Sequence, residues 1–452
     1  MAQIKLYQIR LSRLKCFAVM LGVITLLVLL QLSALCKLVW FRGTLFCWLR
    51  GAADPPRRDA GPRPARAARF RPGAFLRNRT ADDRPHCRFR YDLASSGTPE
   101  LNVSLSPELG DRYRVVYNVI ESDAAWGDGD RVTLCSHVTP EFAAHVAELV
   151  TRWEGPLSIA AFVPDRDAAD LVCAFRTLCR CLEDMSRVSL HLVFPKDAPP
   201  KFAPCGRRDG CRLPRQGLTF RARNKMTYPV NVARNAARFG AFTRFILVSD
   251  VELYPSGGLE SGFVRWITQL GSWELGRVAF VVPVFEVDER SPVPGTKSRL
   301  LALHQEERAV YFHKWICAHC QKFPGIEKWL KRPDPGSGVV QALLISKREY
   351  PFHRWEPIFI GTHADPLYSE SLSWEGRQDK MTQMHLMCLM SYRFVILDGA
   401  FLTHSPGIKR KFESGIERRL KLQYEHQNYL QYNRIVKEAS KEYGVNEKCR
   451  IH

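Results

Sequence analysis

Asp250 and Glu252 are the residues whose types and spacing point most directly to chemistry. They follow an apolar run, Phe245–Val248, and precede Leu253–Pro255. Side chains two residues apart at the end of a strand point to the same side. Two like charges so placed repel each other unless a cation lies between them, and hard divalent ions prefer carboxylate oxygens as ligands. The pair therefore indicates a divalent-metal site that could neutralise a diphosphate leaving group, although an isolated acidic pair is more often a solvated loop.

The elements that must position this pair alternate between strands and helices. Strands are expected at residues 131–135, 157–163, 188–194, 244–248 and 278–284, and helices at 140–153, 168–181 and 228–239. This order predicts an α/β fold with a mainly parallel sheet and helices on both faces. Ligands of such sheets bind at the carboxyl ends of the strands. Ser136 and His137, in the exit loop after the first strand, are therefore expected beside the acidic pair. There they would contact the nucleotide that carries the diphosphate.

The amino terminus carries an uncharged apolar run at residues 17–36, preceded by four basic residues and followed by fewer. Twenty apolar residues can cross a bilayer as one helix, and the positive-inside bias places the short tail in the cytoplasm and the body in the lumen. The alternative is a cleaved signal peptide, but the run is long for one and no clear cleavage site follows. We expect a cytoplasmic tail at 1–16, a signal anchor at 17–36, a flexible stem at 37–86 and a lumenal body at 87–452.

The net charge of +20 raises the question of nucleic-acid binding. Residues 1–90 hold 18 Lys and Arg against 4 Asp and Glu, a net charge of +14, so about +6 remains for the rest. This distribution argues against a nucleic-acid partner. The basic, Pro- and Ala-rich residues 51–85 contain too little apolar surface to fold and are typical of a spacer. Asn78 and Asn102 begin N-glycosylation sequons, as a lumenal body allows.

The chain has 14 cysteines, of which eleven lie in the body. A lumenal domain would oxidise many of them, and the odd number leaves at least one free or paired between chains. Cys205 and Cys211 flank a short Gly- and Arg-rich loop and could form a disulfide. Cys317 and Cys320, with His313 and His319, could instead bind zinc, but a lumenal setting without a second cysteine pair favours a disulfide or buried thiols.

Five ordered blocks carry a resemblance to a known family. They lie at residues 228–238, 248–256, 282–286, 355–360 and 394–404. In sequence, order and spacing they resemble β-1,4-glucuronyltransferase 1 and the carboxyl-terminal glucuronyltransferase domain of LARGE, and the resemblance extends from about residue 132 to 407. It implies a GT-A fold, a UDP-sugar donor, a metal ion such as Mn²⁺ or Mg²⁺ and transfer with inversion. The metal ligands of the family match Asp250, Glu252 and His404, although the second carboxylate is usually Asp.

Inverting transfer also needs a base to take the proton of the acceptor hydroxyl. The loop at residues 374–380 resembles the loop that carries the base in several inverting GT-A enzymes. Asp379 and Glu375 are its candidates, and Asp379 is preferred. The vertebrate glucuronyltransferases have Asn where Asp379 stands, and the alternative is a surface loop whose acid caps the helix expected at 380–390.

Other polar residues are candidates for binding the donor or the acceptor. A glucuronate carboxylate needs a cation, for which Arg234 and Arg377 are suitable, and Asn231 lies one helical turn before Arg234. Glu286 and Glu356 follow apolar strands and could bind acceptor hydroxyls or satisfy nearby backbone. The charged carboxyl-terminal segment at residues 416–443 is expected to be a helix that packs on the body through Leu420 and Tyr424.

Together these features predict a Golgi type II membrane protein that transfers glucuronic acid from UDP-glucuronic acid to a terminal sugar, xylose by family inference, of a protein-linked glycan. Two alternatives stay open. One is the same fold acting on UDP-xylose, UDP-galactose or UDP-N-acetylglucosamine, and the other is a non-catalytic relative that binds a glycan or a partner. Assembly with itself or with other transferases also stays open.

Overall fold

The computed structural model describes residues 68–93, 99–123, 129–206, 210–214, 217–271, 276–410 and 415–449, the side chains between 415 and 421 excepted. All of them belong to one compact unit, Ala67–His452. The apolar run at residues 17–36 lies outside the described residues. Among the helices that are described, none combines the length and the apolar character needed to cross a membrane.

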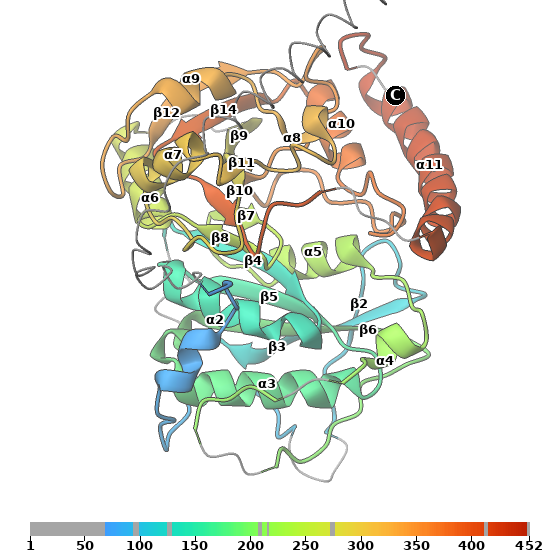
Figure 1. Ribbon diagram of the computed structural model, residues 1–452. Helices are drawn as coiled ribbons and strands as arrows, with labels where there is room; N and C mark the ends of the chain where they lie inside the picture. The colour runs from blue at the N-terminus through green and yellow to red at the C-terminus, as the bar shows by residue number, and fades with distance from the viewer. Residues whose placement is uncertain are drawn as a thin grey trace, which may run out of the picture. The chain divides into compact units, whose positions relative to one another are not determined.

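The main sheet has eleven strands in the order β1-β3-β6-β5-β4-β7-β13-β9-β14-β12, with β2 paired to β3 (Figure 1). The strands are β1 (Arg88–Phe89), β2 (Ser104–Leu105), β3 (Tyr113–Glu121), β4 (Val132–Val138), β5 (Leu157–Phe162), β6 (Val188–Pro195), β7 (Phe245–Val248), β9 (Val278–Val281), β12 (Gln341–Ser346), β13 (Phe359–Thr362) and β14 (Arg393–Asp398).

The sheet is mixed: the expectation of a mainly parallel sheet holds at its centre and for the neighbours β9 and β14, and it was wrong for the other strand pairs. Strands β6, β5, β4 and β7 are parallel neighbours, as the βαβ order predicted. Strand β13 then inserts antiparallel between β7 and β9, and β3 and β12 extend the two sides antiparallel to β6 and β14. Antiparallel strands need no crossover helix, and the later part of the chain lacks the regular βαβ alternation that would build a parallel sheet.

A second, four-stranded sheet has the order β11-β10-β15-β8. Its strands are β8 (Leu253–Pro255), β10 (Val284–Val287), β11 (Ala309–Tyr311) and β15 (Leu402–His404). The single strand expected at residues 278–284 is in fact two, because β9 belongs to the main sheet and β10 to this one. Pro283 lies at the transition, where a residue without an N–H cannot continue a ladder.

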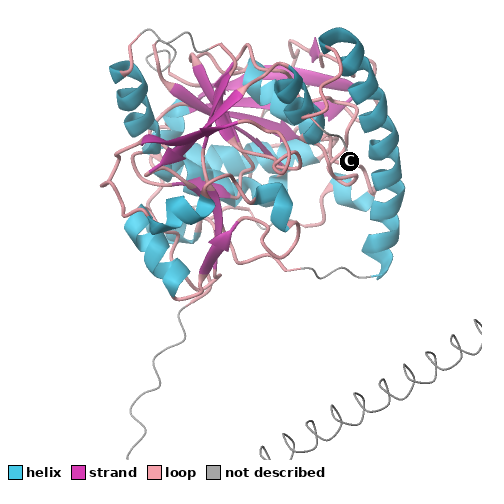
Figure 2. Ribbon diagram, turned by 90° about the horizontal axis from the view of Figure 1, so that it is seen from above, coloured by secondary structure: helices cyan, strands magenta, loops and turns pink. Residues whose placement is uncertain are grey.

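Helices cover both faces of the main sheet, as expected (Figures 1 and 2). The helices of the described residues are η1 (Ala74–Asn78), η3 (Pro140–Phe142), α2 (Ala143–Arg152), α3 (Asp167–Cys181), η4 (Glu183–Arg187), α4 (Phe220–Arg223), α5 (Val230–Phe239), α6 (Leu259–Gln269), α7 (Lys297–Gln305), α8 (Ala318–Gln321), α9 (Ile326–Lys331), α10 (Met381–Leu389) and α11 (Gly415–Tyr443).

The alternation of buried side chains along the central strands separates two apolar cores. Cys135, Ala160 and Ile246 pack with helix α5 on one face. Leu134 and Leu247, their neighbours along the chain, pack with α2, α3 and α6 on the other face. This follows from the period of two along a strand, and it fixes the strand ends that carry the polar residues.

Residues 68–86, which were expected to belong to the stem, lie against the body. The N–H of Phe70 donates to the carbonyl of Glu289 at 2.7 Å, and Gly73 donates to the buried Glu148 at 3.0 Å. Leu76 is buried. These contacts hold the segment to the body, although its basic composition did not indicate such packing.

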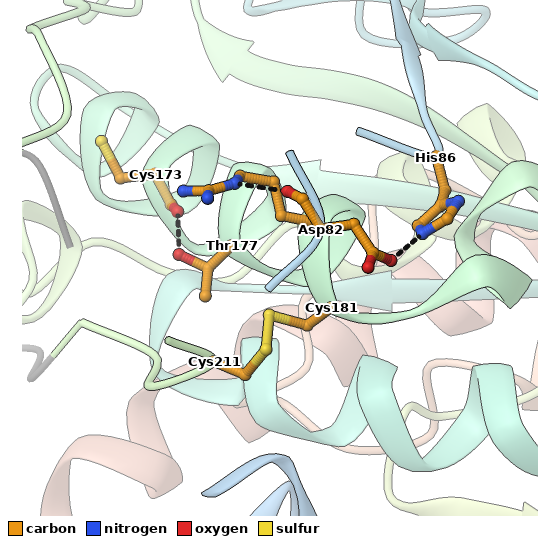
Figure 3. The surroundings of a disulfide bond; sticks show 7 residues. Asp82, His86, Cys173, Thr177, Cys181 and Cys211 are labelled. Carbon is orange, nitrogen blue, oxygen red and sulfur yellow. Dashed lines mark hydrogen bonds and ion pairs between the residues drawn. A yellow bond between two sulfur atoms is a disulfide. The ribbon is translucent and has the colours of Figure 1, made fainter. Parts of the chain in front are cut away.

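Five disulfides connect ten of the eleven body cysteines. The pairs are Cys87–Cys179, Cys173–Cys205, Cys181–Cys211, Cys317–Cys320 and Cys388–Cys449. The buried Cys135 is the free thiol. The expected Cys205–Cys211 pair was therefore wrong: Cys173 and Cys181, two turns apart on α3, each pair with one cysteine of the loop after β6. Figure 3 shows Cys181–Cys211 with Asp82 and His86 close to α3.

Candidate active site

The acidic motif lies at the carboxyl ends of two parallel strands. Because Cys135 of β4 is in register with Val248 of β7, the next residues of both strands face each other. The hydroxyl of Ser136 donates to the carbonyl of Ser249 at 2.9 Å, and Nε2 of His137 lies 3.1 Å from Oδ1 of Asp250. Both residues belong to β4 rather than to an exit loop. Ser136 thus supports the backbone of the motif, whereas His137 contacts its first carboxylate.

His137 is held between Asp250 and a tyrosine. Its Nδ1 lies 2.7 Å from the hydroxyl of Tyr228. Burial lowers the pKa of His137, although Asp250 opposes this shift. In the neutral ring, Nε2–H donates to Asp250 and Nδ1 accepts from the tyrosine hydroxyl. Tyr228 and His137 together orient Asp250. Tyr228 is a member of the site that sequence reasoning did not identify.

Arg234 joins two carboxylates from distant parts of the chain. Its guanidinium pairs with Asp379 and lies 3.2 Å from Oδ1 of Asp250, and it also donates to Oδ1 of Asn231 at 3.0 Å. Burial acts to raise the pKa of Asp250, but Lys380, His137 and Arg234 outweigh it and hold that pKa well below its usual range. Asn231 in turn donates to the carbonyl of Asp379. Asn231 and Arg234 of α5 therefore hold Asp379 and Asp250 in place. The guanidinium of Arg234 already has three partners, Asp250, Asp379 and Asn231.

The second sheet brings Glu252 and His404 together. His404 of β15 is in register with Leu253 of β8, the residue after Glu252. Nε2 of His404 lies 3.9 Å from Oε2 of Glu252 and has no hydrogen-bond partner among the described residues. Burial lowers the pKa of His404 to about 3, and burial raises that of Glu252. A neutral imidazole therefore faces a poorly compensated carboxylate.

These residues fit a divalent ion in part. Nδ1 of His404 lies 3.3 Å from the carbonyl of Gly407, which leaves the lone pair of the buried Nε2 directed away from that carbonyl. A metal-binding histidine is held in this way. The fit is incomplete because Oδ1 of Asp250 is engaged by His137 and Arg234. Among the described residues, the His, Cys, Asp and Glu ligand atoms that gather within 4.8 Å belong to Cys317, His319 and Cys320, and there the two cysteines form a disulfide.

A pocket of about 830 Å³ opens over the acidic motif. This volume suits a nucleotide sugar. Sequence reasoning missed several of its lining residues, namely Arg221, Phe312, Trp374 and Lys409, and it also did not identify Lys380 beside the motif. Lys380 lies 3.9 Å from Asp250, and Lys409 lowers the pKa of Glu252. Lysines thus stand on both sides of the motif, at the place where a diphosphate would need positive charge.

The loop at residues 374–380 forms one wall of this pocket. Both carboxylate oxygens of Glu375 accept from the N–H of Tyr228, at 3.0 and 3.2 Å. Asp379 is paired with Arg234. Arg377 is exposed and pairs with Glu425 of α11 at 2.9 Å. The loop therefore places Asp379 beside Arg234, Glu375 against the backbone of Tyr228 and Arg377 beside the carboxyl-terminal helix.

The two remaining predicted acids have different surroundings. The oxygens of Glu286 accept from the backbone N–H groups of His313 and Lys409, both at 3.1 Å, so this buried residue satisfies backbone. Glu356 lines the pocket, and no described donor lies within hydrogen-bond distance of its carboxylate. Burial raises the pKa of Glu356 to about 7.

Comparison with known proteins agrees with the resemblance that the five motifs carry. A family model described as "Glycosyl-transferase for dystroglycan" matches residues 131–444. The chain is 27% identical over 373 residues to beta-1,4-glucuronyltransferase 1 of Homo sapiens, covering 78% of this chain and 84% of the relative. It is 26% identical over 318 residues to the Danio rerio protein of that name, covering 65% and 72%. It is 24% identical over 282 residues to xylosyl- and glucuronyltransferase LARGE2 of Mus musculus, covering 61% and 34%.

The matched region contains the second sheet, the main sheet from β4 onward, the acidic motif, His404 and the loop at residues 374–380. The family predicted from the motifs is thereby confirmed. The chain belongs to this glycosyltransferase family, and it is a glycosyltransferase.

Proposed function

We propose that this protein is a metal-dependent, inverting GT-A enzyme that transfers glucuronic acid from UDP-glucuronic acid to a terminal sugar, preferably xylose, of a protein-linked glycan. The observation that carries the proposal is the unpartnered Nε2 of His404 facing Glu252 beside Asp250, at a strand end that opens into a pocket. The names of the relatives support the choice of sugar.

Asp250, Glu252 and His404 would hold the ion, Mn²⁺ or Mg²⁺. Bound there, it would supply positive charge against the diphosphate of the leaving group. Asp250 would first have to release Oδ1 from Arg234 or bind through its other oxygen.

The chain's own cations would complete donor binding. Lys409 lines the pocket, and Lys380 lies 3.9 Å from Asp250, so both are placed to pair with phosphate oxygens. Arg221 also lines the pocket, and its guanidinium lies 3.9 Å from Glu375. It is a better partner for the glucuronate carboxylate than Arg234, whose guanidinium already serves Asp250, Asp379 and Asn231.

The setting of the reaction is part of the proposal. A basic tail before an uncharged run of twenty residues supports a type II protein of the Golgi membrane with its body in the lumen. The disulfides of the body agree with an oxidising compartment.

The test is a transfer assay with purified full-length protein, a β-xyloside acceptor, and UDP-glucuronic acid, UDP-xylose, UDP-galactose or UDP-N-acetylglucosamine as donor. Mass spectrometry identifies the product, with Mn²⁺ and with EDTA. We expect transfer of glucuronic acid that EDTA abolishes. Transfer of a different sugar alone would contradict the choice of donor. UDP binding without transfer from any donor would instead indicate the non-catalytic alternative.

A further inference from the structure

The carboxylates of the pocket differ in the hydrogen bonds and ion pairs that they already make. Five acidic residues line it, namely Asp250, Glu252, Glu356, Glu375 and Asp379. Asp250 and Asp379 share Arg234, and Glu375 accepts from the backbone of Tyr228. Each of these would have to leave a partner before it could accept a proton.

Glu356 has no such partner among the described residues. Its oxygens make no hydrogen bond and no ion pair there, although the side chain is half buried. Glu252, the other acid without a hydrogen bond, faces His404 and belongs to the proposed metal site. Glu356 is thus the pocket carboxylate outside that site whose oxygens stay available to a ligand.

The backbone of Glu356 is fixed on both sides. Its N–H donates to the carbonyl of Cys320 at 2.8 Å. The preceding Trp355 is buried, and its carbonyl accepts from Nε of the buried Arg348 at 2.6 Å. The next strand, β13, starts at Phe359 inside the main sheet. Such a frame holds a side chain in place without engaging its carboxylate.

Charged groups around Glu356 suit proton acceptance near neutral pH. Burial raises its pKa to about 7, and the charge of Asp379 acts in the same direction. Lys380, Arg348 and Arg234 oppose the shift. A base is most effective when its pKa lies near the operating pH.

We propose that Glu356 is the general base of the transfer reaction and takes the proton of the acceptor hydroxyl, an inference that rests on the proposed function. The acceptor oxygen forms a bond to the anomeric carbon, and the bond from that carbon to the diphosphate breaks. The electron pair of the broken bond leaves with UDP, and the proton passes to Oε1 or Oε2 of Glu356. Asp379 then holds Arg234 and the loop in position.

The test compares Glu356→Gln with Glu356→Asp and Asp379→Asn in full-length protein. Gln keeps the shape of the side chain but cannot take the proton, so kcat should fall about a hundred- to ten-thousandfold. UDP affinity with Mn²⁺, measured by calorimetry, should stay within about threefold. Glu356→Asp should retain more activity than Glu356→Gln. The matched control is Glu349→Gln, which lies outside the pocket and pairs with Lys347 at 3.9 Å, and it should keep wild-type kcat.

The pH profile gives a second measurement. A base must be unprotonated in the free enzyme, so wild-type kcat/KM should fall as pH drops below about 7. Glu356→Gln should lose this acid limb in its residual activity. Thermal unfolding shows whether each variant is folded.

Near-wild-type kcat in Glu356→Gln overturns the inference, as does an equal loss of UDP binding and kcat. A larger loss in Asp379→Asn than in Glu356→Gln assigns the base to Asp379 instead. If the wild-type protein transfers no sugar from any donor, the proposed function falls and the inference falls with it. Wild-type transfer with an unimpaired Glu356→Gln overturns the inference alone.

Discussion

Arg234 sets the charge balance of the acidic motif. It is buried, and it neutralises part of both Asp250 and Asp379, which lie far apart in the sequence. Apolar strand residues followed by two acids were enough to predict the location of Asp250 and Glu252. The engagement of Asp379 could not be predicted, because it depends on how the loop at residues 374–380 folds back over α5.

At Asp250, replacement by Asn should abolish transfer while the protein stays folded. Asn keeps the hydrogen bonds of the side chain but removes the charge that would hold a divalent ion. We expect a loss of roughly a thousandfold in rate, equivalent to about 4 kcal/mol of transition-state stabilisation. Transfer assays and thermal unfolding measure the two effects.

The control for this change is Asp130→Asn, because Asp130 is a surface acid paired with Arg244 at 2.7 Å. It should leave the transfer rate unchanged. Full activity of Asp250→Asn, or of the wild-type protein in EDTA, would show that the reaction needs no metal at this site.

His404→Ala should weaken the metal-dependent binding of UDP. The unpartnered Nε2 of His404 is the best-placed neutral ligand atom beside Glu252, and its removal leaves a bound ion with one ligand fewer. Calorimetry with UDP and Mn²⁺ should show at least a tenfold loss of affinity, about 1.4 kcal/mol. The exposed His426 of α11 offers the matched control, His426→Ala. Unchanged UDP affinity in His404→Ala would make this histidine structural.

Individual elements were predictable where local pattern determines them. Helices α2, α3 and α5 and strands β5 and β6 lie within a few residues of their expected bounds, because apolar periodicity and the βαβ order agree there. The place of β13 between β7 and β9 was not predictable, since short apolar strands carry little information about their partners. The break at Pro283 that separates β9 from β10 had a local signal, the missing N–H, which the prediction did not use.

The carboxyl-terminal helix supports the pocket rather than merely covering the body. In Figure 1, α11 lies beside α10, and Tyr432 and Val436 pack against Met381. Asn428 donates to the carbonyls of Ser373 and Arg377, at 2.9 and 2.6 Å. Of the two expected contacts, the side chain of Leu420 lies outside the described residues, and the backbone carbonyl of Tyr424 lies close to Gly376.

Asn428→Ala should therefore destabilise the loop at residues 374–380. The change leaves two part-buried carbonyls without their donor, and a buried unsatisfied group costs about 1–3 kcal/mol, which is the upper bound for each. We expect a lower unfolding midpoint and a several-fold lower kcat, with UDP affinity nearly unchanged. The neighbouring exposed Gln427 provides the control, Gln427→Ala. A variant that unfolds at the wild-type temperature and keeps wild-type kcat would separate α11 from the function of the loop.

At the scale of the whole molecule, cysteine pairing shows what a sequence leaves undetermined. The odd number of body cysteines predicted that at least one stays free or pairs between chains, and Cys135 is the free thiol among them. Proximity in sequence suggested Cys205–Cys211, yet both pair with α3 instead. Pairing depends on which Cα atoms the fold brings within about 6 Å, and here Cys173 and Cys181 of α3 lie next to the loop that follows β6.

Membrane topology gives the last prediction. The structure places Asn78 and Asn102 on exposed segments of the body, so both sequons are accessible if the body enters the lumen. Endoglycosidase treatment of the expressed full-length protein should then increase its gel mobility, and the Asn78→Gln/Asn102→Gln variant should migrate like the treated wild type. Protease added outside sealed vesicles should leave the body intact, since the basic residues before 17–36 keep only the short tail in the cytoplasm. Degradation of the body in sealed vesicles would reverse the proposed orientation. Intact body with unchanged mobility in both proteins would contradict the use of the sequons while leaving the orientation in place.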